Sequence, residues 1–249
     1  MKQNQETVTL PKKSLKNLLG VLADFELFRD EIEDYLLAHD PIFIKKMKQA
    51  RLYALLFHHA ADLMAENADL LFEAARSLKN RGLVEKIGVS VYSPAEIEAV
   101  TGRFPIDLIQ APFNVLDQRI LQNGLSVKLK AQGIELHVRS IFLQGILLCK
   151  PEVVPSFFQP AREKIQQYQE FLSRAGLSPL DGALQCALQS GADAAILGIS
   201  SLPEFQEILC AWKKNSAGLT ALDFSPFALE DEGMVNPARW PKIPQGEMA

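Results

Sequence analysis

Short apolar segments alternate with amphipathic segments along most of the chain. Runs of strand length stand at residues 52–57, 86–91, 107–111, 135–140 and 194–198, and their apolar, largely β-branched content favours strands. After the first run, Leu70, Ala74 and Leu78 recur at helical spacing, and Gly82 stands where such a helix should end. Helices are also expected within residues 116–133 and at residues 202–214. The pattern therefore predicts parallel strands joined by crossover helices.

Two of the expected helices begin with recognisable capping signals. Residues 93–96 read SPAE and residues 178–181 read SPLD. In each, a serine is placed as the N-cap and a proline as the first helical residue. Glu96 is also placed to close a capping box with Ser93.

An alternation of this kind fits an open doubly wound sheet or a closed (β/α) barrel. No GxGxxG turn follows the first strand, which weakens the case for a dinucleotide-binding open sheet. A sixth strand is expected at residues 7–10, and residues 14–48 are expected to be mostly helical. Six strands are two fewer than a closed barrel needs. We expect one domain over residues 1–249, with an irregular, proline-rich tail from about residue 221.

Composition and charge exclude few classes of function, but they bear on which partners and which cellular compartment to expect. The 249 residues include 48% hydrophobic and 22% charged residues, and the net charge of −4 gives no reason to expect nucleic acid or an anionic membrane as partner. Three cysteines without paired spacing favour a reducing compartment over a disulfide framework or a metal site. Neither a secretory leader nor a membrane span is recognisable. A cytoplasmic protein is therefore expected.

Polar residues stand at the carboxyl ends of the expected strands, where parallel α/β folds gather their functional groups. These residues are His58, Ser90, Gln110, Arg139, Ser140, Gly198 and Ser200. Each also has a purely structural interpretation. The histidine could be satisfied by a backbone carbonyl, the serine and glutamine could belong to turns, and the last segment could only cap a helix. The functional alternative for that segment is a phosphate held by backbone N–H groups.

The amino-acid sequences at these strand ends resemble those of one family. In order along the chain, the segments read LLFHHAADL, EKIGVSVYSPAEI, DLIQAPFNVLDQR, GIELHVRSIFLQG and AAILGISSLPEF. Together they resemble the aldo/keto reductases, and most closely a bacterial branch of them, from about residue 6 to about residue 212. The resemblance implies an α/β fold of (β/α)8 TIM-barrel type. Aligned on it, the chain is N-terminally incomplete, with about six of eight strands present.

The resemblance also implies a cofactor, NADP or NAD, bound across the carboxyl-end rim, and hydride transfer to the carbonyl of a small substrate. His58 matches the active-site histidine, whereas His59 has no counterpart and is expected to be incidental. Ser90 and Gln110 match residues that bind the nicotinamide carboxamide. The other expected cofactor-binding residues are Arg139, Ser140, Leu143, Gln144, Gly145, Gly198 and Ser200. Of these, Arg139 stands where many members place an aromatic ring.

Three further family residues have no clear match: an aspartate, a proton-donating tyrosine and the lysine that lowers the tyrosine's pKa. Residues 7–14 align with the strand that should end in the lysine, so Lys12 or Lys13 could substitute by a shifted register. Neither Tyr35 nor Tyr53 stands where the proton donor should. A positioned general acid contributes roughly 10²–10⁴-fold to rate, so activity could be lost. The chain could be a truncated homologue, lack its true start, or have a rebuilt first segment.

Three hypotheses remain at this stage. The first is NAD(P)H-dependent reduction of an aldehyde or ketone. The second is a non-catalytic, degenerate barrel that binds a nucleotide or a protein partner. The third is an unrelated phosphate-binding (β/α) enzyme that uses residues 198–201. Glu204, Phe205 and Glu207 stand where a basic residue would favour NADP, so the NAD alternative is open. The substrate and the oligomeric state are not predicted.

Overall fold

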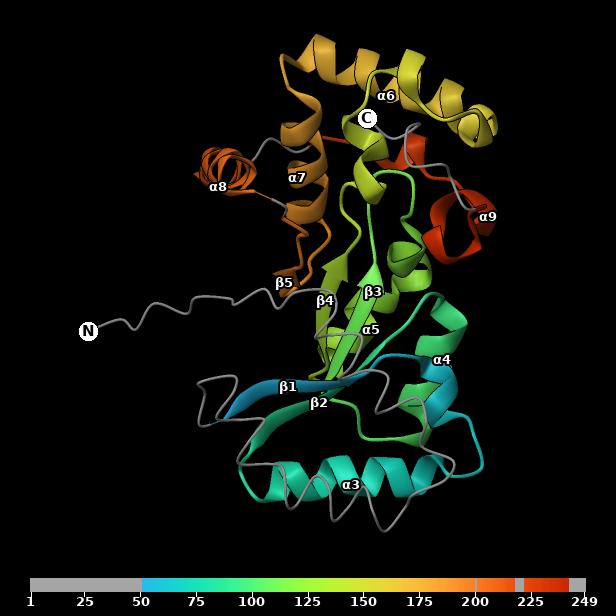
Figure 1. Cartoon of the computed structure of the whole chain (residues 1–249), viewed down its shortest axis with the longest axis vertical. Helices are drawn as coiled ribbons and strands as arrows, with labels where there is room; N and C mark the ends of the chain where they lie inside the picture. Colours follow the sequence, from blue (N-terminus) through green and yellow to red (C-terminus); the bar gives the residue numbers. More distant parts are fainter. Residues whose placement is uncertain (1–50, 200, 218–221, 242–249) are drawn as a thin grey trace, which may run out of the picture.

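Five parallel strands form one sheet in this computed structural model, which describes residues 51–199, 201–217 and 222–241 (Figure 1). The strands follow one another in sequence order across the sheet. They are β1 (Leu52–Phe57), β2 (Val84–Ser90), β3 (Leu108–Pro112), β4 (Glu135–Arg139) and β5 (Ala194–Ala195). The predicted parallel α/β fold is thereby confirmed. The sixth strand expected at residues 7–10, the helical region expected at residues 14–48 and Lys12 and Lys13 lie outside the described residues.

Helices connect the strands and surround the sheet. The α-helices are α3 (Ala68–Asn80), α4 (Pro94–Arg103), α5 (Leu125–Ala131), α6 (Arg162–Ala175), α7 (Pro179–Gln189), α8 (Leu202–Ala217) and α9 (Glu232–Val235). The 3₁₀ helices are η1 (Ala60–Leu63), η2 (Arg119–Gly124), η3 (Leu143–Leu148), η4 (Pro151–Val153), η5 (Ser156–Ala161), η6 (Ser225–Phe227) and η7 (Pro237–Arg239). In Figure 1, β1 and β2 cross the view at a steep angle to β3 and β4. Strands in a curved, barrel-type sheet are arranged in this way.

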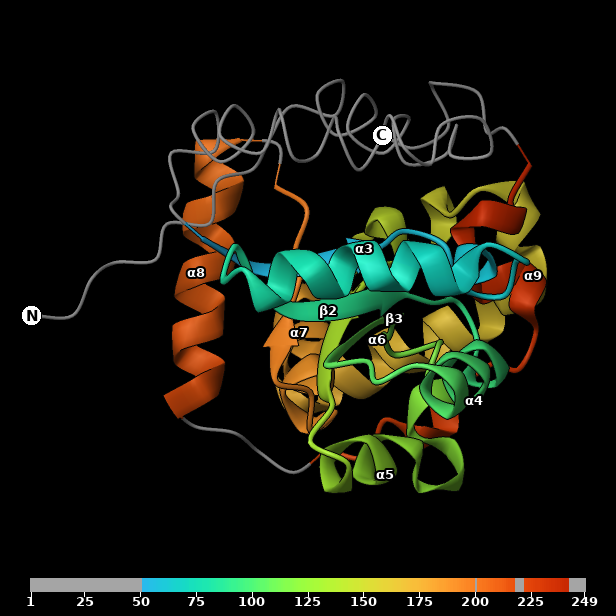
Figure 2. The ribbon, with the colours of Figure 1, turned by 90° about the horizontal axis from the view of Figure 1, so that it is seen from below.

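Helix α3 lies along β2 and buries an apolar face against the sheet (Figure 2). The ring of Phe72 stacks on Phe57 of β1 at 6.5 Å and on Phe104 at 4.8 Å, centroid to centroid. The buried residues of α3 are Ala68, Phe72, Ala75 and Leu78. The predicted apolar face was therefore wrong in part, because Leu70 is 44% exposed. The helix is rotated so that its aromatic ring, and not Leu70, fills the space between sheet and helix.

Both predicted capping signals are used, but one differs in detail. Ser93 accepts a hydrogen bond from the Glu96 N–H at 3.3 Å, while the Glu96 carboxylate accepts from the N–H of Tyr92 at 2.6 Å. The second half of the expected capping box is thus displaced by one residue. At the start of α7, Ser178 and Asp181 form a complete capping box. These bonds satisfy N–H groups that the first helical turn leaves without a partner.

Strand β5 is shorter than the predicted run at residues 194–198. Its ladder with β4 ends with the Ile196 N–H donating to the Val138 carbonyl at 2.8 Å. Strand β4 stops at Arg139, and Ser140 turns away with a φ of 62°. Residues 197 and 198 therefore have no length of β4 left to pair with.

The tail after residue 221 is tied by Glu232 to Arg119, which forms a buried ion pair with Asp117 in the segment after β3. Arg119 donates from Nε and Nη2 to the two carboxylate oxygens of Asp117, both at 2.8 Å, and from Nη1 to Glu232 of α9 at 2.9 Å. Only 8% of the Arg119 side chain and 1% of the Asp117 side chain are exposed. Phe224 and Phe227 are buried in the same hydrophobic cluster as the strands. The tail expected to be irregular thus contains short helices that complete the core.

No helix within the described ranges has the length and the apolar character needed to cross a membrane.

Asp117→Asn should destabilise the fold, because it leaves the buried Arg119 charge without its two-point partner. We expect the free energy of unfolding, measured by urea titration, to fall by about 3 kcal/mol. Asp69→Asn is the matched control, since Asp69 pairs with Arg103 at an exposed site and its loss should cost at most about 0.5 kcal/mol. Equal losses in the two variants would contradict the role given to this ion pair.

Candidate active site

The strand register brings the first three predicted residues to one level of the sheet. Ser90 of β2 pairs with Gln110 of β3, and their side chains meet with 3.1 Å between the Ser90 hydroxyl and Gln110 Oε1. Phe57 of β1 pairs with Val89, so the next residue, His58, continues the register beside Ser90. Paired residues of parallel strands project to the same face. A histidine, a hydroxyl and an amide are therefore grouped near the carboxyl ends of three neighbouring strands.

His58 contacts its neighbour His59. The His58 Nδ1 lies 3.0 Å from the His59 Nε2, and the two rings meet edge-on with centroids 4.3 Å apart. Partial desolvation lowers the pKa of His58 from its ordinary value, and positive charge on His59 and Arg139 lowers it further, against the opposing effect of Asp62. These effects favour the neutral imidazole form of His58.

Arg139, at the end of β4, is held in a fixed position. Its Nη2 donates to the Val91 carbonyl at 3.1 Å and its Nη1 to the Ser140 hydroxyl at 3.3 Å. The guanidinium lies over the ring of Tyr92, 4.4 Å from its centroid. One face of the cation thus rests on an aromatic ring of the protein itself. The opposite face is the one that a planar ligand could use.

The segment after Arg139 contains an unusual run of left-handed backbone. Positive φ angles occur at Ser140 (62°), Leu143 (46°), Gln144 (56°) and Gly145 (91°), and this conformation is unfavourable for residues other than glycine. The Leu143 side chain is completely buried, so of its groups only the backbone could face a cofactor. The Ser140 carbonyl accepts a hydrogen bond from the Asn114 side chain at 3.1 Å, which helps to hold the turn.

The last predicted segment is only partly described. Gly198 lies between β5 and α8, and the space where a Cβ would project from it is open. Ser200 lies outside the described residues. The neighbouring Ser201 has its hydroxyl 3.3 Å from the Glu204 N–H, so it caps the start of α8. Phe205 is 43% exposed on the same helix.

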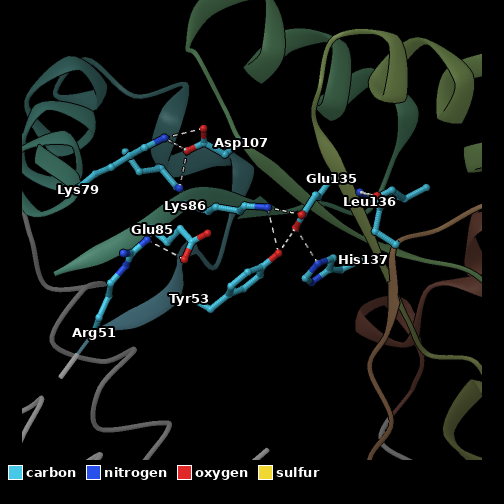
Figure 3. Close-up of polar contacts among 11 residues, drawn as sticks. Arg51, Tyr53, Lys79, Glu85, Lys86, Asp107, Glu135, Leu136 and His137 are labelled. Carbon is cyan, nitrogen blue, oxygen red and sulfur yellow. Dashed lines mark hydrogen bonds and ion pairs between the residues drawn. The ribbon is translucent and has the colours of Figure 1, made fainter. Parts of the chain in front are cut away.

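A second polar group, which the sequence analysis did not identify, lies among β1, β2 and β4 (Figure 3). Tyr53 donates its hydroxyl proton to the Glu135 carboxylate at 2.6 Å, and Lys86 bonds both the Tyr53 hydroxyl, at 3.0 Å, and Glu135. His137 approaches the same carboxylate at 3.3 Å. We call these four residues the Glu135 cluster. Tyr53 and Glu135 stand near the starts of their strands, whereas His137 pairs with Gln110, so the cluster extends from the strand starts to the level of Gln110.

Within the Glu135 cluster, Lys86 and Glu135 form an ion pair. Desolvation raises the pKa of Glu135, but hydrogen bonds from Lys86 and Tyr53 outweigh it and hold the pKa below its ordinary value of 4.5. The hydrogen bond to Glu135 also raises the pKa of Lys86. The pKa of Tyr53 is raised, because its bond to the carboxylate outweighs the effect of Lys86. A tyrosine with a raised pKa is a weaker proton donor than a free one.

One sequence signal could have revealed part of this cluster. Glu135, His137 and Arg139 alternate with the buried residues Leu136 and Val138, and this period of two places the three polar side chains on one face of β4. His137 pairs with Gln110 in the register, so it belongs to the same level as the candidate site. The remaining partners could not be found, because Tyr53 is 82 positions from Glu135.

The residues at the rim suit a nicotinamide cofactor. A carboxamide needs both an acceptor for its N–H groups and a donor for its oxygen. The contact between Ser90 and Gln110 leaves the Gln110 amide N–H groups available, and Oε1 keeps a second lone pair. Arg139 adds a fixed positive charge and a flat surface. Residues 51–199, 201–217 and 222–241 contain no group of three His, Cys, Asp or Glu side chains that could hold a metal ion.

Glu135→Gln should change how stability depends on pH. Because the folded pKa of Glu135 is depressed, its contribution is present above about pH 4.3 and is lost as the pH falls through the folded value. We expect the variant to be less stable than the wild type by about 1–3 kcal/mol at pH 7, in urea titrations. The difference should shrink towards zero below about pH 4. A difference independent of pH would show that the charge on Glu135 is not what matters.

Gln144→Gly should stabilise the fold, because glycine adopts the left-handed conformation without steric cost. We expect the free energy of unfolding to rise by about 1 kcal/mol, which is roughly 2–4 °C in Tm for a chain of this size. Gln144→Ala keeps the Cβ and serves as the control, with no gain expected. If alanine stabilised the chain as much as glycine, the backbone strain assigned to this turn would be wrong.

Comparisons with known proteins bear on the family and the fold. The Aldo/keto reductase family matches residues 22–222, while a search of curated proteins gave no match. Among solved structures, aldo-keto reductase AKR11C1 from Bacillus halodurans superposes with a TM-score of 0.62 at 16% identity, covering 84% of this chain and 72% of that one in its apo form. Its holo form gives the same TM-score and identity, with 85% and 68% covered.

A third structure is the thermostable aldo-keto reductase Tm1743 in complex with the inhibitor epalrestat. It has a TM-score of 0.55 and 18% identity, and the match covers 78% of this chain and 64% of that one. At these identities the solved structures establish the fold, which is of the (β/α) barrel type of these reductases. The family match over most of the chain goes further, and the chain belongs to the aldo/keto reductase family.

Proposed function

We propose that this chain binds NAD(P)H at the carboxyl-end rim of its sheet and reduces the carbonyl group of a small aldehyde or ketone. One observation carries the proposal above all others: the contact between Ser90 and Gln110 on adjacent strands, level with His58. Ser90 and Gln110 come from separate strands and lie side by side, and both were predicted to bind the nicotinamide carboxamide. Family membership supports carbonyl reduction in general.

Each residue has a role that follows from its chemistry. The cofactor, when bound, supplies the hydride. Ser90 and Gln110 would hold the carboxamide and so fix which face of the nicotinamide is presented. His58, as a neutral imidazole, would donate one hydrogen bond to the substrate carbonyl and orient it. Arg139 would support the cofactor ring with the guanidinium face that Tyr92 leaves uncovered. Ser140, Gln144 and Gly145, with the Leu143 backbone, would cover its pyrophosphate.

The choice between NAD and NADP follows from the start of α8. An adenosine 2′-phosphate carries negative charge and favours a basic partner. Here Phe205 and Glu207 are exposed and Glu204 is half-buried. Gly198 would still approach the adenosine side through its backbone, and for Ser200 the role rests on the family resemblance alone. We therefore propose that NADH binds more tightly than NADPH.

A second candidate function is nucleotide binding without catalysis, and one observation favours it. Among the described residues, Tyr53 contacts both a lysine and a carboxylate. Its pKa is raised, and it lies near the start of β1. It is therefore poorly suited to supply a proton at the rim. Without a positioned acid, turnover would be weaker by roughly 10²–10⁴-fold. A small carbonyl substrate, a single domain and a cytoplasmic location remain parts of the proposal.

Fluorescence titration with NADH and NADPH tests the proposed site. We expect saturable binding, and we expect Ser90→Ala and Gln110→Ala each to weaken it by about tenfold, since each removes one hydrogen bond in a desolvated site. Ser173→Ala, on the exposed face of α6, is the matched control and should bind like the wild type. Binding that is absent, or equal in all variants, would rule the site out.

Turnover of simple aldehydes then separates the two candidate functions. Oxidation of NADH that depends on both aldehyde and His58 would establish the reductase. Tight cofactor binding with no turnover by the same preparation would favour the non-catalytic alternative.

A further inference from the structure

We infer that His59 is a positioning residue that fixes which nitrogen of His58 carries the proton. The sequence analysis assigned this second histidine no role, and the inference differs from that expectation because the two rings are in contact. The catalytic part of the inference rests on the proposed function. The structural part, the tautomer of His58, does not.

The two rings are placed for a direct hydrogen bond. The His58 Nδ1 and the His59 Nε2 are 3.0 Å apart, within the range of a good N–H···N contact. The angle between the ring planes is 78°, so the edge of one ring meets the other ring. Since both atoms are imidazole nitrogens, one of them must carry the hydrogen and the other must accept it.

Only two arrangements are possible when both rings are neutral. If His59 donates from Nε2, then His58 has a bare Nδ1 and carries its own hydrogen on Nε2. If His58 donates from Nδ1, then His58 has a bare Nε2, and His59 must carry its hydrogen on Nδ1. The Nε2–H form is the more stable tautomer of a free histidine side chain. The first arrangement therefore uses the favoured form of both rings, and the second uses the disfavoured form of both.

The first arrangement is also the one that can act on a carbonyl. A protonated Nε2 on His58 can donate a hydrogen bond to a carbonyl oxygen, whereas a bare Nε2 would repel it. His59 thus leaves His58 with one N–H group, on the nitrogen that does not face His59. The tautomer of a histidine is set by the hydrogen bond that its other nitrogen makes.

Both rings are exposed, and the backbone that carries them is anchored on one side. Directly after His59, the short helix η1 anchors the chain through the buried residues Ala60 and Leu63. The Asp62 N–H donates to the His59 carbonyl at 3.2 Å, which fixes the backbone of His59. The charged groups that act on His58 are His59, Arg139 and Asp62, and the first two disfavour a second proton on it.

Long-range ¹H–¹⁵N NMR of the imidazole rings tests the inference on the full chain, without substrate or cofactor. His58→Gln assigns the signals. At pH 7.5 we expect His58 to carry its hydrogen on Nε2, with an unprotonated Nδ1. His59→Ala should shift the His58 nitrogen signals towards those of a mixture of tautomers. His59→Gln should restore them, because the glutamine amide can donate to the same nitrogen. Ser173→Ala, on the exposed face of α6, is a control that should leave the His58 signals unchanged.

Steady-state kinetics add a second readout if the chain turns over. His59→Ala should lower kcat by about three- to tenfold, the effect of one hydrogen bond, with cofactor affinity unchanged and with partial recovery in His59→Gln. The inference is overturned if His58 carries its hydrogen on Nδ1 in the wild type, or if its signals are the same in His59→Ala. If the predicted tautomer is found but no cofactor binds, the proposed function fails while the role of His59 in setting the tautomer stands.

Discussion

The parallel register between neighbouring strands is the constraint on which the rest of the molecule depends. A shift of one residue would turn every side chain of a strand to the opposite face. With the observed pairing, Ser90, Gln110 and His137 occupy one level across β2, β3 and β4, and His58 continues it from β1. The helices hold that register from outside, for example through Phe72 between sheet and helix.

Two polar groups share the resulting sheet and differ in what they can do. At the rim, the pKa of His58 is lowered by partial desolvation, and Arg139 is held in place by a carbonyl and an aromatic ring. Nearer the strand starts, Lys86 and Glu135 neutralise each other, and Tyr53 is bound to both. The first group has hydrogen-bonding capacity left for a ligand, whereas the second uses its capacity internally. The rim is therefore the place where the proposed cofactor site lies.

Much of the fold could be predicted from the sequence, because local pattern determines it. Strand β1 was placed at its observed residues, since an apolar run between polar segments has few alternatives. The shortening of β5 could not be foreseen, because it depends on the left-handed turn that ends β4 at Ser140. The face of α3 was also misjudged at Leu70, since the spacing alone does not reveal that Phe72 meets two other rings.

For the candidate site, the prediction was better for residues at strand ends than for their partners. Ser90 and Gln110 were each expected at the end of a strand; Ser90 does end β2, whereas β3 continues past Gln110 to Pro112, and their contact confirms that they are neighbours. The bonds between Arg119 and Glu232, 113 positions apart, arise only from the folded chain. The contact between the side chains of His58 and His59 also arises only in the folded chain, because adjacent side chains on a regular strand would point apart. Ser200 and the first 50 residues lie outside the described part of the chain.

Intermolecular NOE spectroscopy with added NADH tests the central claim most directly. That claim is that His58, Ser90 and Gln110 together line one cofactor site. The account predicts NOEs from the nicotinamide ring protons to the His58 imidazole and to the side chains of Ser90 and Gln110. Saturable cofactor binding with nicotinamide NOEs to other parts of the protein, and to none of these three residues, would contradict it.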